Sequence, residues 1–138
     1  ALQRLAGDKY KARIHKAYQY LLATQVPIGG WGYGDNIKLQ PDYADESCSQ
    51  YAILGLAAAK DIGLALPQRT VTEALGFYGK RQNADGGWSL SGDRSDVDMT
   101  AMALQALAPY KNSEQVYSYQ NKKLYPDGKT VEKRCIPA

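Results

Sequence analysis

Asp96 and Asp98 are the residues whose type and spacing could support chemistry, in the segment Asp-Val-Asp-Met-Thr-Ala over 96–101. A carboxylic acid that protonates a weak base has to stay protonated itself, and this requires a dry cavity. Ser95-x-x-Asp98 also fits a helix capping box, and the helix dipole favours negative charge at a helix N-terminus. The residues alone predict the start of a helix, and an acid site would need such a cavity around them.

Metal ligands are sparse in the sequence. Cys48, Cys135 and His15 form no zinc-binding spacing, and two cysteines make no disulfide framework. Cys48 falls in an apolar stretch, where a cysteine behaves as a small hydrophobic residue. We expect no metal and no evident cofactor.

The distribution of charge argues against a nucleic-acid partner. The net charge is +3, yet residues 1–110 contain 11 basic and 11 acidic groups, and residues 111–138 contain 6 and 3. Phosphate binding favours basic residues clustered on one face with aromatic residues between them. The longest nonpolar run, 52–59, is too short to span a membrane. We expect neither nucleic acid nor a transmembrane segment.

Hydrophobic periodicity predicts four helices within residues 1–110, in a chain of 138 residues with ordinary globular composition. Apolar residues at three- and four-residue intervals indicate an amphipathic helix over about 8–25. About 47–62 is apolar nearly all round, which is typical of an interior helix. Thr70-x-x-Glu73 predicts the capping box of a second amphipathic helix, and Ser95-x-x-Asp98 that of a second apolar helix. The predicted fold class is all-α.

The sequence repeats itself. Gln25-Val-Pro-Ile-Gly-Gly-Trp31 returns as Gln82-Asn-Ala-Asp-Gly-Gly-Trp88, an offset of 57, and the following helices align at an offset of 51 because the first loop is six residues longer. Duplication at this period is typical of stacked helical hairpins. We expect two units, over about 8–62 and 67–110, with apolar helices in an inner layer and amphipathic helices in an outer layer.

The repeated residues suit a structural role, although contact with a ligand is an alternative. A glycine pair permits a tight turn with positive φ, a glutamine can bond free backbone groups at helix ends, and a tryptophan can cover the joint between helices. These residues are Gln25, Gly29, Gly30, Trp31, Gln82, Gly86, Gly87 and Trp88.

Residues 111–138 form a basic tail of different character. Alternating sequences at 116–119 and 129–133 flank the turn signal Pro126-Asp-Gly128 and predict a short β-hairpin. Because it contains few aliphatic residues, we expect it to pack weakly, as an insertion leading toward a further repeat. A second interpretation is a surface for a protein or a carbohydrate. Its residues would be Tyr117, Tyr119 and Tyr125.

The segments 16–31 and 77–88 resemble the QW motif of terpenoid cyclases, which has a basic residue, an aromatic and aliphatic pair, Gln, and then Gly-x-Trp. Together the two copies are similar to the prenyltransferase and squalene-oxidase repeat. The resemblance implies an α/α toroid of concentric helices, of which two helical hairpins form a part.

The same resemblance gives residues 96–101 a chemical meaning. The segment resembles the Asp-x-Asp-Asp-Thr-Ala motif of class II terpene cyclases, whose middle aspartate protonates an alkene or an epoxide. This implies Asp98 as the general acid and Asp96 as its supporting group, with Met99 in place of the family's adjacent carboxylate. A squalene-type cyclase that acts on a polyprenyl substrate is the alternative function.

Both units are also similar to large bacterial surface or secreted proteins that carry these repeats without a known reaction. This implies a non-catalytic toroid segment of a larger protein that acts as a ligand-binding or scaffold module. Cobalamin or another corrinoid, or an apolar ligand, follows by analogy with toroidal cobalamin carriers. Two hairpins are too few to close a ring. We therefore expect the remaining repeats of a parent protein, or a second copy, as partners.

Overall fold

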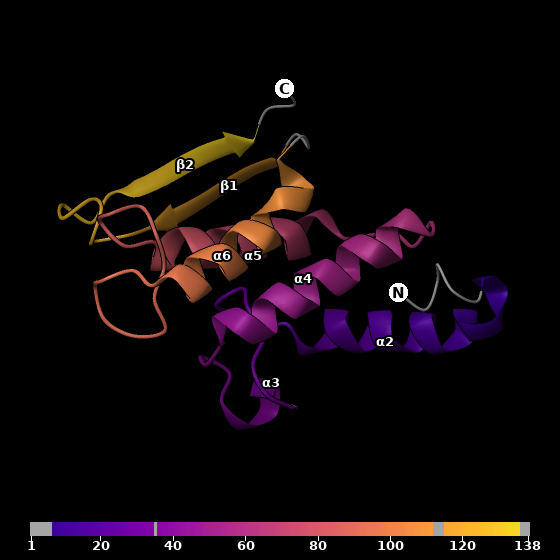
Figure 1. Ribbon diagram of the computed structural model, residues 1–138. Helices are drawn as coiled ribbons and strands as arrows, with labels where there is room; N and C mark the ends of the chain where they lie inside the picture. The colour runs from indigo at the N-terminus through magenta and orange to yellow at the C-terminus, as the bar shows by residue number, and fades with distance from the viewer. Residues whose placement is uncertain (1–6, 35, 112–114, 136–138) are drawn as a thin grey trace.

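The computed structural model describes residues 7–34, 36–111 and 115–135. Helices come first along the chain and a β-hairpin comes last (Figure 1). The elements are η1 (Gly7–Tyr10), α2 (Lys11–Thr24), α3 (Asn36–Leu39), α4 (Glu46–Asp61), α5 (Gln68–Arg81), α6 (Val97–Leu107), η2 (Ala108–Tyr110), β1 (Gln115–Gln120) and β2 (Thr130–Cys135). The predicted mainly helical chain with a C-terminal hairpin is confirmed. Residues 112–114 and 136–138 of the predicted tail lie outside the described residues.

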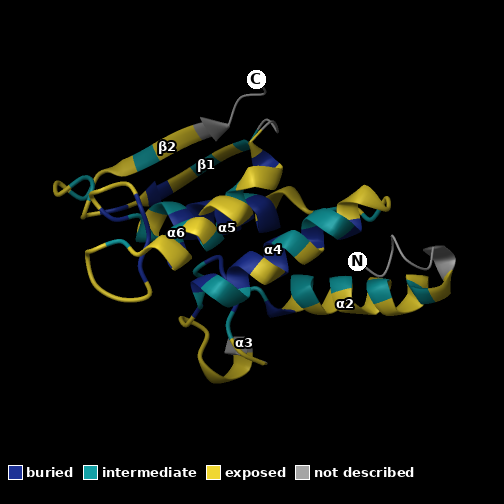
Figure 2. Ribbon diagram, viewed as in Figure 1, coloured by how far each residue is buried: buried dark blue, intermediate teal, exposed yellow. Residues whose placement is uncertain are grey.

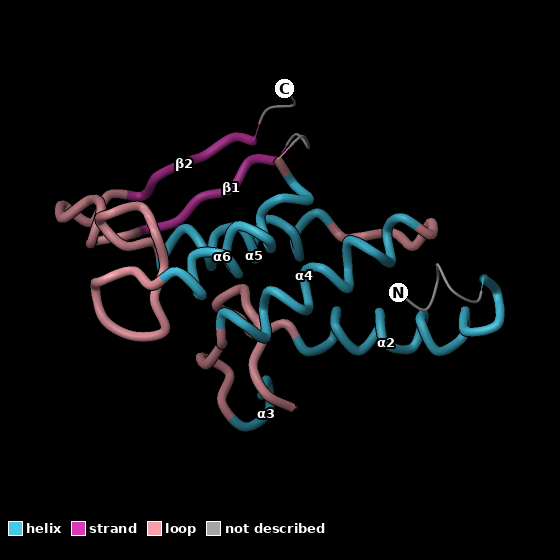
Figure 3. The backbone as a smooth tube through the Cα atoms, viewed as in Figure 1, coloured by secondary structure: helices cyan, strands magenta, loops and turns pink. Residues whose placement is uncertain are grey.

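The second helix of each unit packs on that of the other, because α4 lies along α6 rather than along α5. α2 lies along α4, α4 lies along α6, and β1 lies along α5 (Figure 1). Figure 3 shows the long loop between α2 and α4, which contains the short helix α3. The first unit therefore lies at one side of the molecule and the hairpin at the other.

The hydrophobic core lies where α4, α5 and α6 meet (Figure 2). α2 contributes only partly buried side chains to it, among them Tyr18, Leu21 and Leu22. The large polar face of α2 faces water, as its amphipathic pattern predicts. The buried members of the core are Val26, Trp31, Ala44, Ala52, Ile53, Leu56, Val71, Ala74, Leu75, Phe77, Tyr78, Trp88, Met99, Ala103, Ala106 and Tyr110.

Helix α4 is not buried all round, so that prediction is wrong for one flank. Ala52, Ile53 and Leu56 face the core, but Tyr51 is 69% exposed and Leu54 is only half-buried. α2 and α6 cover two sides of α4, and a third side stays open in the part of the chain that the structure describes. Apolar composition alone does not reveal which side has a neighbour.

The capping box predicted for α5 is wrong. The helix begins at Gln68, and Pro67 at its N-cap makes no side-chain hydrogen bond. Proline is pre-organised for the start of a helix because its φ is fixed, here at −58°. Thr70 therefore falls inside the helix and is buried, and Glu73 pairs with Arg69 at 2.7 Å.

The β-hairpin packs firmly, contrary to the weak packing predicted for it. Its register runs from Gln115 opposite Cys135 to Gln120 opposite Thr130. Tyr119 is 6% exposed and lies over Gly79 of α5, so close that a Cβ there would come within 2.5 Å of the ring. The missing glycine side chain opens room for the tyrosine. Tyr119 is thus occupied within the molecule, and its predicted role in docking a partner is wrong.

Asn121 fastens the hairpin to the end of α5. Its side chain is buried, and Nδ2 donates to the carbonyl oxygens of Gly79 and Gln82 at 2.8 Å each. Its Oδ1 accepts hydrogen bonds from the backbone N–H groups of Lys123 and Leu124 at 3.0 and 3.1 Å. Asn121 satisfies carbonyl groups that a helix end leaves free. A polar residue therefore provides a contact that counting aliphatic residues could not predict.

Candidate functional site

The first Gly-Gly-Trp turn is closed by backbone and side-chain hydrogen bonds. Val26 N–H donates to Gly30 O at 2.9 Å, and Gly29 N–H donates to Val26 O at 2.8 Å. The Gln25 amide Nε2 donates to Gly29 O at 2.9 Å and to Thr70 O of α5 at 3.0 Å. Gln25 therefore holds its own turn closed and ties it to the next unit.

The second turn repeats these bonds. Asn83 N–H donates to Gly87 O at 2.8 Å, Gly86 N–H donates to Asn83 O at 2.9 Å, and Gln82 Nε2 donates to Gly86 O at 2.7 Å. Gly29 and Gly86 have φ of +99° and +91°, which an L-residue rarely adopts. The two turns have one geometry despite different sequences between Gln and Gly.

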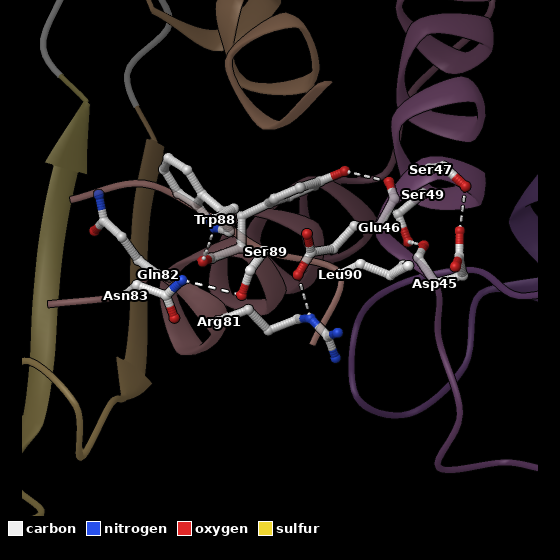
Figure 4. A network of polar contacts seen from close by, with 12 residues as sticks. Asp45, Glu46, Ser47, Ser49, Arg81, Gln82, Asn83, Trp88, Ser89 and Leu90 are labelled. Atoms are coloured by element: carbon white, nitrogen blue, oxygen red, sulfur yellow. Dashed lines mark hydrogen bonds and ion pairs between the residues drawn. The ribbon is translucent and has the colours of Figure 1, made fainter. Parts of the chain in front are cut away.

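Both tryptophans are buried and use the indole N–H in the same way. Trp31 Nε1 donates to Leu21 O at 2.7 Å. Trp88, which Figure 4 shows, donates from Nε1 to Tyr78 O at 2.9 Å. Each acceptor lies ten residues before its tryptophan, near the end of the preceding helix, α2 or α5. The ring thus covers the joint while its polar atom satisfies a backbone carbonyl.

The backbone of each tryptophan fixes the start of the helix that follows. Trp31 O accepts from Asp45 N–H at 2.8 Å, and Trp88 O accepts from Asp96 N–H at 2.9 Å. Trp31 N–H donates to Ser49 Oγ at 2.9 Å, and the corresponding bond of Trp88 goes to Thr100 Oγ1 at 3.0 Å. Every residue of the repeated motif lies within this hydrogen-bonded frame.

Asp96 is the N-cap of α6, and the capping box predicted from Ser95 and Asp98 is wrong. Asp96 Oδ1 accepts from Met99 N–H at 2.7 Å, just as Asp45 Oδ1 accepts from Cys48 N–H at 2.9 Å. Ser95 lies before the helix, where its hydroxyl donates to Asp85. The bond between Asp96 N–H and Trp88 O fixes where the helix begins, and the sequence pattern does not contain that contact.

Asp98 lies in the first turn of α6 with an exposed side chain. It shares this turn with Asp96, but Asp96 is engaged as the helix cap. Alkene protonation needs an acid held in a dry cavity, and the exposed side chain of Asp98 does not lie in one. The geometry at residues 96–101 is that of a helix start.

Glu46 is a buried carboxylate that the sequence pattern did not single out. It is 2% exposed, and its Oε1 accepts from Nε of Arg81, which packs over the Phe77 ring (Figure 4). Tyr78 OH donates to the backbone oxygen of Glu46 at 2.8 Å. Among the described residues, Glu46 Oε2 has no hydrogen-bond partner. The pair joins α4 of the first unit to α5 of the second.

Replacing Glu46 by glutamine should alter the pH dependence of stability. Burial raises the pKa of Glu46 above its ordinary 4.5, although Arg81 opposes the shift. The native state therefore binds a proton more tightly than the unfolded chain does, and the wild type should lose stability relative to Glu46→Gln as pH rises from about 4 to 7. Urea unfolding at both pH values tests this. A wild-type gain with rising pH would contradict it.

Other reactive groups form no centre in the part of the chain that the structure describes. Burial raises the pKa of the Cys48 thiol, and the nearby Asp45 carboxylate adds to the shift, so the thiolate nucleophile is disfavoured. Within the same residues, no three His, Cys, Asp or Glu side chains come close enough to hold a metal ion. None of the described helices has the length and apolar character needed to cross a bilayer.

The described site is thus a pair of matching structural turns beside a capped helix, with the half-buried ion pair of Glu46 and Arg81 between the units. A scan of protein-family models and a search of solved structures both gave no match for the chain.

Proposed function

We propose that the chain is a non-catalytic segment of an α/α-toroid repeat scaffold. The observation that carries the proposal is the duplicated frame, in which Gln25 and Gln82, and Trp31 and Trp88, make corresponding backbone hydrogen bonds. Side chains committed to closing a turn are not available to a substrate. A scaffold role uses all of these contacts, whereas a catalytic role leaves them unexplained.

The position of Asp98 also favours a scaffold over a cyclase. The side chain is exposed, and the following residue, Met99, supplies no charge. Neither condition suits an acid that must protonate an alkene. The wider context in this proposal, a larger bacterial surface or secreted protein, rests on the resemblance of the repeats alone.

An apolar ligand is the form of ligand binding that the fold supports best. A cavity of about 350 Å³ lies between α5, α6 and β1. This is near the small end of the range for ligand sites, which suits a flexible hydrocarbon chain better than a corrinoid ring. Its lining residues are Leu75, Leu104, Leu107, Ala108, Lys111 and Tyr117.

Incubation with squalene and with a linear polyprenyl alcohol tests the non-catalytic proposal. We expect no cyclised product from the wild type or from Asp98→Asn, and the same thermal stability for both proteins because the side chain is exposed. Cyclised product that disappears in Asp98→Asn would overturn the proposal in favour of a cyclase. Calorimetric titration with cobalamin and with the polyprenyl alcohol then separates ligand binding from a purely structural scaffold.

A further inference from the structure

Helix α6 has an exposed apolar stripe. Val97, Ala101, Leu104 and Ala108 recur at intervals of four, three and four residues and so share one side of the helix. Val97 is 84% exposed and Leu104 is 57% exposed, and Figure 2 shows the exposed side of α6. We call these four residues the α6 stripe. A shallow cavity of about 590 Å³ runs from this stripe to Gly86 and Gly87 of the second turn.

Three of the four corresponding residues of the first unit are buried, and the fourth, Ala57, is half-buried. At the repeat offset of 51, the α6 stripe matches Glu46, Gln50, Ile53 and Ala57 of α4. Ile53 is 2% exposed against 57% for its counterpart Leu104. The second unit covers this side of the first, because α4 packs against α6. The α6 stripe is therefore the surface on which a following unit would pack.

The two turns show the same asymmetry. A Cβ on Gly29 would lie 2.8 Å from the backbone carbon of Glu73 and still closer to its oxygen, whereas a Cβ on Gly86 would have no described atom within 4 Å. Gln25 donates to two acceptors, one of them in the next unit. Among the described residues, Gln82 Nε2 donates to Gly86 O alone. The second turn thus has the same contact surface without the neighbour.

The opposite end of the molecule carries the complementary surface. Tyr51, Leu54 and Ala58 lie on one flank of α4, and their counterparts on α6 are Met102, Gln105 and Pro109. Gln105 is on the side of α6 that meets α4, because it accepts a hydrogen bond from Gln50. Tyr51, Leu54 and Ala58, which we call the α4 flank, are therefore the surface that would meet a preceding unit.

The residues that would meet have matching chemistry. Within the chain, the Gln50 side chain donates to that of Gln105. At the repeat offset of 51, Gln50 corresponds to Ala101 of one copy and Gln105 to Leu54 of the next. The polar pair inside the chain is thus replaced by an apolar pair between copies. Likewise, Glu46 and Arg81 pair within the chain. Their counterparts, Val97 of one copy and the buried Thr24 of the next, are both uncharged, so no charge is left without a partner there.

Charge is complementary at the turn as well. Ile28 and Glu73 line one cavity where the first turn meets α5. At the offset of 57 that relates the two turns, Ile28 corresponds to Asp85 of one copy, and Glu73 corresponds to Lys16 of the next. Opposite charges at these positions favour association and disfavour other registers.

We propose that a second copy of this chain packs head to tail on the first, with the α6 stripe of one copy against the α4 flank of the next. The contact repeats the geometry of α4 on α6 within the chain. It rests on the repeat scaffold proposed above and names the partner of that scaffold. A head-to-tail contact leaves one free surface at each end, so further copies add until a ring closes or a filament forms.

Sedimentation velocity of the full chain over a range of concentrations tests the proposal. We expect the wild type to associate, and Leu104→Arg and Tyr51→Arg each to weaken association about tenfold or more. Both side chains are exposed, so the folded core should be preserved, as circular dichroism can verify. Leu39→Arg is the matched control, because Leu39 is an exposed leucine on α3 and belongs to neither surface.

A mixture of Leu104→Arg and Tyr51→Arg identifies the arrangement. Each variant keeps one intact surface, so a head-to-tail contact should restore pairs, and only pairs, in the mixture. A monomeric wild type at millimolar concentration would overturn the proposal. So would a Tyr51→Arg variant that associates like the wild type while Leu104→Arg does not, because that result indicates a two-fold contact between α6 stripes. Cyclase activity is measured separately, so its outcome does not affect this test.

Discussion

Replacing Gly29 by alanine should lower the free energy of unfolding by about 3–5 kcal/mol, one of the largest effects of any single methyl group in the chain. Two costs add. The φ of +99° disfavours an L-residue, and the new Cβ would lie 2.8 Å from the backbone carbon of Glu73. Glu73 is in the body of α5, so the helix would have to shift to make room. Urea unfolding monitored by tryptophan fluorescence measures the loss.

Gly86→Ala is the matched control. It has nearly the same φ, +91°, and belongs to the same hydrogen-bonded turn, but a Cβ there would have no described atom within 4 Å. We expect it to cost about 1–2 kcal/mol, from backbone strain alone. The difference between the two variants isolates the packing of the first turn on the second unit. Equal losses would show that α5 does not pack closely on the first turn.

Replacing Gly79 by alanine should lower stability by about 1–3 kcal/mol and displace the hairpin from α5. The Tyr119 ring occupies the space that the new methyl group needs. In a Tyr119→Ala background that clash disappears, and the same substitution should then stabilise the chain by up to about 1 kcal/mol, because alanine is the better helix former. The effect of Gly79→Ala on the free energy of unfolding should therefore have opposite signs in the two backgrounds, and a double-mutant cycle measures the difference.

Gly55→Ala on α4 is the control for helix propensity. Gly55 is exposed within a helix, and a Cβ there would meet only the end of the Leu21 side chain, at 3.2 Å. We expect a small gain in stability from this substitution. If Gly79→Ala changed the stability of the wild type by the same amount as Gly55→Ala, then β1 would not lie on α5 in solution.

The turns and the order of the helices follow from sequence because their determinants are local. Gly-Gly-Trp and the glutamine before it define a turn within seven residues, and the second copy at an offset of 57 supports the assignment. Gly29 and Gly86 adopt the positive φ expected of one glycine in each pair. Local backbone preference and hydrophobic periodicity agree at these positions, which is where sequence interpretation is strongest.

Contacts between distant residues account for what the sequence did not predict. The start of α6 depends on a bond between Asp96 and Trp88 O, and the capping pattern of Ser95 and Asp98 contains no trace of it. The hairpin packs closely on α5 because Gly79 has no side chain. A hydrophobic pattern does not show the effect of a missing side chain. The partner of Glu46 lies 35 residues away in Arg81.

In the candidate site, too, the local part was predictable from the sequence and the long-range part was not. The motif residues from Gln25 to Trp31 lie together as their spacing indicates, whereas the burial of Glu46 has no signal of its own except the comparison with Val97 at the same repeat position. A charged residue in one unit and an apolar residue in the other point to different neighbours. Comparison between units could therefore have identified this position.

The bond between each tryptophan and the next helix separates a constant frame from a variable insert. Trp31 O meets Asp45 N–H and Trp88 O meets Asp96 N–H, so the frame closes in the same way around loops of different length. In the first unit the extra chain includes α3, which lies apart from the packed helices (Figure 1). This loop is consequently a natural point for grafting: a foreign peptide placed there would be displayed on a rigid base, and copies joined head to tail would present it at regular intervals.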